Sequence, residues 1–156
     1  MTNEKTPSLL NDIGTLFKVR LGFFVVLSSV LGWFMGVDNV DIGNVLLLIG
    51  GGYLLTGASN GFNQIIERNN DAIMARTKNR PLPTGRMTIN HALMLSIGAG
   101  ITGIYFLYLL NYSAAILGFI SFVLYAFVYT PLKSRSSLCV FVGAIPGALP
   151  PMIGYV

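Results

Sequence analysis

Three oxygen-bearing side chains stand four residues apart in the one densely charged stretch of an otherwise apolar chain, residues 60–86. They are Asn63, Glu67 and Asp71. On an α-helix four residues advance about 400°, so each side chain lies about 40° around the helix from the one before, and the three form a polar strip about 12 Å long. Hard cations such as Mg²⁺ prefer carboxylate and amide oxygens and usually keep water or phosphate as further ligands. The strip is therefore a candidate magnesium site.

Basic residues follow the strip directly. Arg76, Lys78 and Arg80 come first, then the helix-breaking run at residues 81–85 (PLPTG), then Arg86. Lysine and arginine bind phosphate by charge, and arginine adds a two-pronged hydrogen-bonding fork. An acidic strip followed by a basic loop has the composition that a Mg²⁺–diphosphate site needs.

A second interpretation of the same stretch needs no ligand. Charges at the end of a membrane helix are usually a solvated face that fixes the orientation of the chain. The regular spacing of the three strip residues, together with the basic cluster that follows them, favours a binding site over this interpretation.

The composition indicates an integral membrane protein. The chain has 156 residues, of which 53% are hydrophobic and only 10% charged, whereas a soluble domain carries about 25% charge. We predict an all-α fold, a polytopic bundle of transmembrane helices. The sequence has no basic patch interleaved with aromatic residues, so we expect no nucleic acid partner. The single cysteine, Cys139, excludes a disulfide framework.

Five apolar segments are expected to span the lipid bilayer, each about 20 residues long. They cover approximately residues 17–36, 42–66, 89–110, 114–129, and a fifth stretch that starts near residue 138. The second segment is rich in glycine, at residues 50–52 and at Gly57, so a neighbouring backbone can approach it closely. We expect residues 1–10 to form a cytoplasmic tail and residues 11–156 to form one transmembrane domain.

Prolines mark the fourth and fifth segments. Pro131 is expected to stop the fourth helix. The fifth segment contains Pro146, Pro150 and Pro151, which would break a helix exposed to lipid because the freed carbonyl groups find no water there. Two interpretations stay open: a kinked span with a purely structural role, or a broken helix that lines a cavity.

The basic residues predict the orientation of the bundle. With these spans all ten fall on one side of the membrane, and the opposite connections, residues 37–41 and 111–113, contain none. By the positive-inside rule the N-terminus and the loops at residues 67–88 and 130–137 are cytoplasmic. This arrangement puts the strip and Lys133 on the same face of the membrane, where they could share a ligand.

Lys18 and Arg20 lie at the mouth of the first span. The aliphatic part of such side chains can lie along apolar surface while the charged group reaches the lipid head groups. We expect both residues to snorkel in this way.

Four motifs carry a resemblance to a known family. They are the strip N-x-x-x-E-x-x-x-D at residues 63–71, R-T-K-N-R-P-L-P-T-G at 76–85, T-P-L-K at 130–133 and G-A-I-P-G-A-L-P-P at 143–151. Over residues 14–156 the chain resembles the UbiA superfamily of intramembrane prenyltransferases. Within it, the second, third and fourth motifs resemble the haem-farnesylating branch, the protohaem IX farnesyltransferases or haem O synthases.

The resemblance implies an enzyme that depends on Mg²⁺. Its substrates would be farnesyl diphosphate and haem B, and transfer of the farnesyl group to a vinyl carbon of haem B would give haem O, an early step in making haem A for terminal oxidases. The implied location is the lipid bilayer of a bacterial inner membrane. A haem A synthase or an oxidase assembly protein acting downstream is a candidate partner.

The resemblance also implies a role for each matching residue. Asn63, Glu67 and Asp71 would be the catalytic set that holds Mg²⁺ and, through it, the diphosphate. Arg76, Arg80 and Lys133 would bind the diphosphate oxygens.

Members of this superfamily carry about twice as many spans and a second acidic motif in their C-terminal half. We therefore expect this chain to be the N-terminal half of such a bundle, ending in or after the fifth span, and whether it is active alone stays open. Two alternatives stay open. One is a related prenyltransferase that uses a quinone or another aromatic acceptor, and the other is a non-catalytic membrane bundle, such as a fragment of a transporter or an assembly factor.

Overall fold

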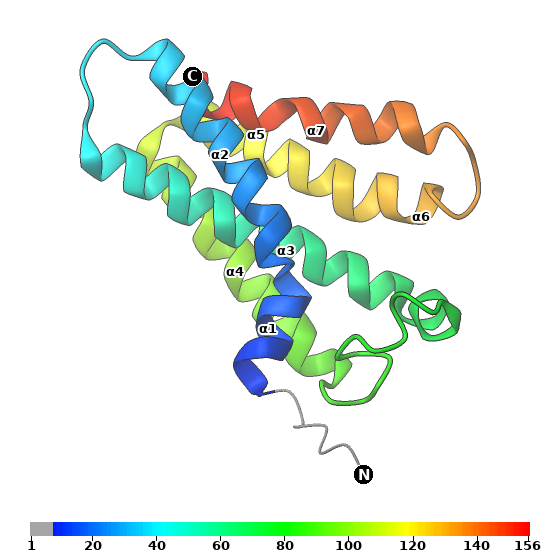
Figure 1. Ribbon diagram of the computed structural model, residues 1–156. Helices are drawn as coiled ribbons and strands as arrows, with labels where there is room; N and C mark the ends of the chain where they lie inside the picture. Colours follow the sequence, from blue (N-terminus) through cyan, green and yellow to red (C-terminus); the bar gives the residue numbers. More distant parts are fainter. Residues whose placement is uncertain (1–7) are drawn as a thin grey trace.

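The computed structural model describes residues 8–156, and helices account for every regular element in that range (Figure 1). The elements are α1 (Leu9–Phe17), α2 (Val19–Gly36), α3 (Ile42–Ile73), α4 (Ile89–Leu110), α5 (Tyr112–Val123), the π-helix η1 (Leu124–Tyr129), α6 (Thr130–Leu132) and α7 (Cys139–Tyr155).

The predicted cytoplasmic tail, residues 1–10, lies mostly outside the described residues. Its last two residues are the first two residues of α1. The Ser8 hydroxyl accepts a hydrogen bond from the backbone N–H of Asn11 and caps the first turn of α1, which therefore begins at Leu9.

Within residues 8–156, four stretches are long and apolar enough to cross a membrane: α2, α3, α4 and the continuous run Tyr112–Leu132. The fifth predicted span, α7, is equally apolar but shorter, at 17 residues. This length is near the lower limit for a membrane-spanning helix. The prediction of an all-α membrane bundle is confirmed.

The helices pack in two main pairs, α3 against α4 and α2 against α7 (Figure 1). A Cβ atom on Gly103 of α4 would lie only 2.8 Å from the backbone nitrogen of Leu55 and 3.0 Å from the carbonyl oxygen of Gly51. Both neighbours are in α3. The α3 and α4 backbones therefore meet closely through small residues, as the glycines in the second span predict.

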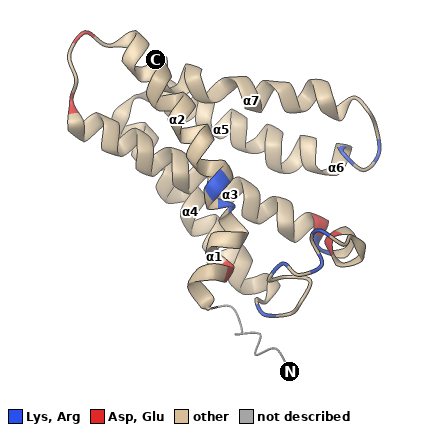
Figure 2. Ribbon diagram, viewed as in Figure 1, with Lys and Arg blue, Asp and Glu red and all other residues tan. Residues whose placement is uncertain are grey.

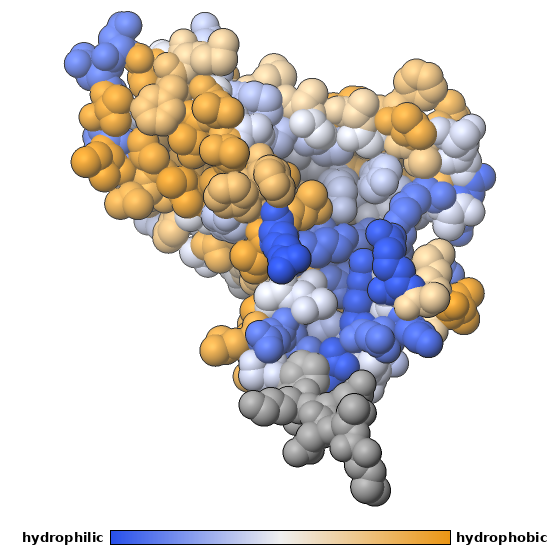
Figure 3. All heavy atoms as spheres, in the orientation of Figure 1, coloured by the Kyte–Doolittle hydropathy of each residue, from blue (hydrophilic) through white to orange (hydrophobic). Residues whose placement is uncertain are grey.

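Charge is distributed unequally between the two ends of the bundle (Figure 2). One end holds α1 and the connections at residues 74–88 and 133–138, and we call it the basic end. The connection between α2 and α3, at the other end, carries Asp38 and Asp41. On the face seen in Figure 3, hydrophilic residues gather near α1, while apolar side chains cover most of the region around the start of α3.

The fourth span ends at Leu132, one residue after the proline that was expected to stop it. A π-helical turn, η1, comes first, and the N–H and the hydroxyl of Thr130 both donate to the carbonyl oxygen of Tyr125. Pro131 then falls in the first turn of α6. A proline is tolerated in a first turn because its missing N–H needs no partner there.

The three prolines of the fifth segment lie inside one continuous helix, α7. Pro146 and Pro150 are buried and line a cavity together with Gly143 and Gly147. Because proline has no N–H, it leaves the carbonyl group four residues before it without a helical partner. The helix therefore lines a cavity, as the second interpretation expects, but it is continuous and not broken.

Candidate functional site

The polar strip occupies the end of α3 that lies at the basic end. α3 continues past its apolar part as far as Ile73, so Asn63, Glu67 and Asp71 all project from one helix. The Asn63 amide donates to a Glu67 carboxylate oxygen at 3.1 Å. Asn63 and Asp71 are only 2% and 3% exposed, whereas Glu67 is partly exposed. Such burial of an amide and a carboxylate needs specific partners.

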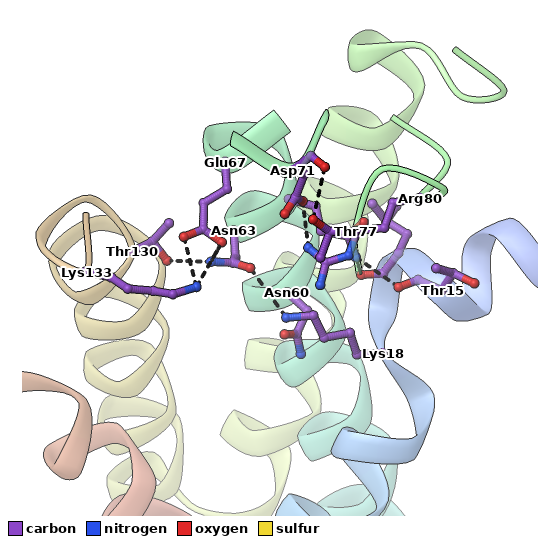
Figure 4. Close-up of polar contacts among 12 residues, drawn as sticks. Thr15, Lys18, Asn60, Asn63, Glu67, Asp71, Thr77, Arg80, Thr130 and Lys133 are labelled. Carbon is purple, nitrogen blue, oxygen red and sulfur yellow. Dashed lines mark hydrogen bonds and ion pairs between the residues drawn. The ribbon is translucent and has the colours of Figure 1, made fainter. Parts of the chain in front are cut away.

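Two cations from different segments pair with the two carboxylates of the strip (Figure 4). Arg80, in the connection after α3, lies 2.6 Å from an Asp71 oxygen. Lys133, just after α6, lies 3.1 Å from one Glu67 oxygen and 3.3 Å from the other. The fold therefore brings together residues that are 66 positions apart in the sequence.

A polar cavity of about 370 Å³ opens between these segments. Five of the six predicted site residues line it: Glu67, Asp71, Arg76, Arg80 and Lys133. The sixth, Asn63, lies behind Glu67 and holds it through the hydrogen bond described above. The cavity thus has two carboxylates and three predicted phosphate ligands in its walls.

The connection between α3 and α4 folds back on the end of α3 because its own polar groups bond there. The Thr77 side chain is buried, and its hydroxyl donates to the Asp71 carbonyl oxygen at 3.0 Å. The Arg80 backbone N–H in turn donates to the Thr77 carbonyl oxygen. This pair of turns carries the Arg80 guanidinium to the Asp71 carboxylate. Thr77 is a part of the site that sequence reasoning missed.

Lys18 is a further missed residue, and the prediction that it snorkels to the lipid head groups is wrong. Its ammonium group lies 3.4 Å from the Asn63 amide oxygen and lines the polar cavity. Burial, with a further contribution from the nearby Arg80 charge, lowers the pKa of Lys18 to about 8. The physical reason for the misplacement is a helix break, because α1 ends at Phe17 and α2 begins at Val19. No glycine or proline marks this break in the sequence.

Thr130 supports the strip from α6. Its buried hydroxyl accepts a hydrogen bond from the Asn63 amide at 3.1 Å and donates to the Tyr125 carbonyl oxygen at 2.8 Å. The Asn63 amide nitrogen therefore donates to Glu67 and Thr130, while its oxygen accepts from Lys18. Thr130 lies in the T-P-L-K motif, so the motif could have identified it as a site residue from the sequence.

The donors of the strip can be tested against a metal ion. No three His, Cys, Asp or Glu side chains within residues 8–156 gather closely enough to hold one. Glu67 and Asp71 do face the same cavity, with the Asn63 amide adjacent. Carboxylates with phosphate and water oxygens are the usual ligands of Mg²⁺. The residues therefore fit an ion that shares its coordination with a bound phosphate.

An apolar cavity of about 200 Å³ adjoins the polar one, and Leu21 of α2 lines both. Its other walls include Val25, Tyr125, Pro146 and Pro150, so α2, η1 and α7 all contribute. A ligand with a charged head and a hydrocarbon chain would find a suitable environment for each part.

Comparison with known proteins shows which family the chain resembles over most of its length. The sequence model described as the UbiA prenyltransferase family matches residues 21–156. A protoheme IX farnesyltransferase from Christiangramia forsetii is 52% identical over 99% of this chain and 51% of its own length. One from Flavobacterium psychrophilum is 47% identical over 96% of this chain and 51% of its own length. The chain thus spans about half the length of these curated relatives.

Two solved structures share the fold. Both are of a UbiA homolog from Archaeoglobus fulgidus, one bound to GPP and Mg²⁺ and the other to DMAPP and Mg²⁺. Their TM-scores are 0.81 and 0.83, and each is 16% identical to this chain, covering 92% of it and 53% of the solved chain. Together with the sequence match, the shared helical fold confirms the resemblance found in the motifs. The chain belongs to the UbiA prenyltransferase family.

Proposed function

We propose that this chain serves a protohaem IX farnesyltransferase, in which farnesyl diphosphate and haem B are converted to haem O and diphosphate. The observation that carries the proposal is the polar cavity, where two carboxylates and several cations face each other beside an apolar cavity. The choice of acceptor is supported by the relatives from Christiangramia forsetii and Flavobacterium psychrophilum, which are named protoheme IX farnesyltransferases.

In this proposal Asn63, Glu67 and Asp71 hold Mg²⁺, which supplies positive charge to the diphosphate when bound. Breaking the bond between C1 of the farnesyl group and the diphosphate oxygen leaves the electron pair on the diphosphate. Fixed cations at that point stabilise the developing negative charge. The π electrons of a vinyl group of haem B form the bond to C1 of the farnesyl group, and water adds to the other vinyl carbon and releases a proton, which gives a hydroxyethylfarnesyl group.

Arg76, Arg80 and Lys133 are the proposed partners of the diphosphate. Arg80 and Lys133 pair with Asp71 and Glu67 in the structure, so each is already held at the wall of the cavity. When a diphosphate and its metal enter, these side chains can turn part of their hydrogen bonding toward phosphate oxygens. Arg76 is exposed and lines the same cavity, with its charge available at the rim.

The orientation of the bundle follows from the positive-inside rule. We place the basic end, with α1 and the connections at residues 74–88 and 133–138, on the cytoplasmic side of a bacterial inner membrane. Farnesyl diphosphate would then reach the polar cavity from the cytoplasm. A haem A synthase or an oxidase assembly protein would be the consumer of the product.

The test is a reconstitution with the complete gene product that contains these residues. Membranes that hold it are supplied with farnesyl diphosphate, haem B and Mg²⁺, and haem O is measured by mass spectrometry. We expect haem O with the unaltered protein and none above background with Glu67→Gln or Asp71→Asn. Prenylation of a quinone precursor with haem B untouched would overturn the choice of acceptor. Unchanged haem O formation in both variants would overturn the site.

A further inference from the structure

Gln64 follows Asn63 in α3 but does not line the polar cavity. It is fully buried, and its side-chain amide donates to the carbonyl oxygens of Thr15 at 2.9 Å and Leu16 at 2.8 Å. Both carbonyls belong to the last turn of α1, where a helix has no backbone partner for them. The amide oxygen of Gln64 has no hydrogen-bond partner in residues 8–156. The polar contacts of this side chain therefore serve only to hold the end of α1.

The residue that follows this turn is a single-residue joint between two helices. Lys18 ends α1, with its N–H bonded to the Gly14 carbonyl oxygen, and its own carbonyl oxygen accepts from the N–H groups of Leu21 and Gly22 in α2. Its φ is 49°, and within the described residues it alone combines a positive φ with a side chain. Such a backbone persists only when the surrounding structure holds it, and it concentrates at functional sites.

The joint directs the Lys18 side chain into the polar cavity. The ammonium group lies 3.4 Å from the Asn63 amide oxygen, and the side chain shares the cavity wall with Glu67, Asp71 and Arg80 (Figure 4). The last turn of α1 and the cavity are therefore linked through two adjacent residues of α3. Gln64 fixes the backbone of α1, and Asn63 accepts a hydrogen bond from the lysine that follows α1.

The far end of α1 has its own anchor. The buried Asp12 carboxylate accepts three hydrogen bonds from Arg86, at 3.0, 3.1 and 3.2 Å, and Arg86 also donates to the Asn79 carbonyl oxygen. Leu16 packs in a small core with Met87. With this anchor at its start and Gln64 at its end, α1 is fixed at the basic end and cannot rotate without breaking one of them.

We propose that Lys18 is a diphosphate-binding residue and that Gln64 positions it by clamping the last turn of α1. The inference rests on the proposed function, because it assigns a further cation to the same diphosphate. Gln64 does not touch the ligand. Its effect on binding passes through the placement of Lys18.

The test measures pyrophosphate binding in the presence of Mg²⁺ by the purified complete protein in detergent micelles. We expect Lys18→Met to weaken pyrophosphate binding roughly tenfold or more, because it removes one charged hydrogen bond to the ligand. We expect Gln64→Met, which keeps the length of the side chain but cannot donate, to weaken binding several-fold. In the Lys18→Met background, Gln64→Met should cause no further loss, since the residue it positions is already gone. Lys18→Arg should restore most of the affinity.

Ser96→Ala is the matched control. Ser96 is also fully buried, and its hydroxyl donates only to Ala92 of its own helix. Hydrogen exchange of the amides in residues 9–18 should rise in Gln64→Met and stay unchanged in Ser96→Ala. Should Gln64→Met fail to fold, Gln64→Asn gives the same comparison, because its amide is one methylene too short to reach α1.

The outcomes separate this inference from the function on which it rests. The inference would be overturned if Gln64→Met weakened pyrophosphate binding equally in the wild-type and Lys18→Met proteins, or if Lys18→Met bound pyrophosphate as well as the wild type. If Glu67→Gln still abolished binding in that case, the proposed function would stand. A complete wild-type protein that binds no pyrophosphate would overturn both.

Discussion

The first half of α3, residues 42–59, packs through small and apolar side chains, whereas the second half, residues 60–73, is held by hydrogen bonds and ion pairs. In the first half Gly51 and Leu55 meet α4 at backbone distance. In the second half the buried polar groups Asn63 and Asp71 each have named partners. Burying such groups costs free energy unless they are paired. One helix therefore combines a structural region with a region shaped for a ligand.

The largest expected effect is on the rate of haem O formation, and it comes from a change in the second half of α3. Glu67→Gln removes the carboxylate charge and keeps the shape of the side chain. We expect haem O formation by the complete protein to fall at least about a hundredfold, as when one charge-stabilising group is removed from an active site. Its ion pair with Lys133 is partly exposed, at 46% for the lysine side chain, so stability should change by less than about 1 kcal/mol. Initial rates and thermal unfolding in detergent check this. A loss of folded protein in proportion to the loss of rate would contradict it.

The next effect is on folding, in the first half. Gly103→Val places methyl groups against the α3 backbone and should destabilise the bundle by about 1–3 kcal/mol. Thermal unfolding followed by circular dichroism measures this loss, and the pyrophosphate affinity of the folded fraction should not change. Gly98→Val, on the same helix but with nothing within 4 Å, is the matched control. Equal destabilisation by both variants would show that close approach is not the cause.

A smaller effect is expected where α1 is anchored. Arg86→Ala leaves the Asp12 carboxylate, only 7% exposed, without its main partner. We expect a loss of about 1–2 kcal/mol, the cost of a buried acceptor left unpaired. Hydrogen exchange should rise in residues 9–17 and stay unchanged in α4. An equal rise in hydrogen exchange throughout the bundle would contradict a stabilising effect confined to α1.

The smallest effect on folding is expected at the rim of the cavity. Lys133→Met should change stability by less than about 1 kcal/mol, because exposed ion pairs contribute little. The same change should weaken pyrophosphate binding several-fold, since it removes one cation from the cavity wall. Calorimetric titration measures the affinity. Unchanged binding would remove Lys133 from the proposed site.

Much of the fold follows from the sequence because hydrophobic length and turn residues determine it. The third span, residues 89–110, coincides with α4, and the Thr88 hydroxyl caps its first turn by accepting from the His91 N–H. The strip at Asn63, Glu67 and Asp71 depends only on helical periodicity, so its geometry was also accessible.

Other features depend on contacts between distant segments. The break at Lys18 has no glycine or proline to mark it, and the turn before it is held by Gln64, which is 48 residues from Leu16 in the sequence. The π-helical turn before Pro131 is another such feature, because no local sequence pattern predicts it. Local propensity therefore predicts spans better than it predicts the joints between them.

The most direct test of the central claim is the binding of farnesyl diphosphate to the purified complete protein, titrated calorimetrically with Mg²⁺ and again with EDTA. If the acidic strip and the basic residues form one Mg²⁺–diphosphate site, binding requires Mg²⁺ and falls at least tenfold in Asp71→Asn. Equal affinity with EDTA, or in Asp71→Asn, would contradict the account.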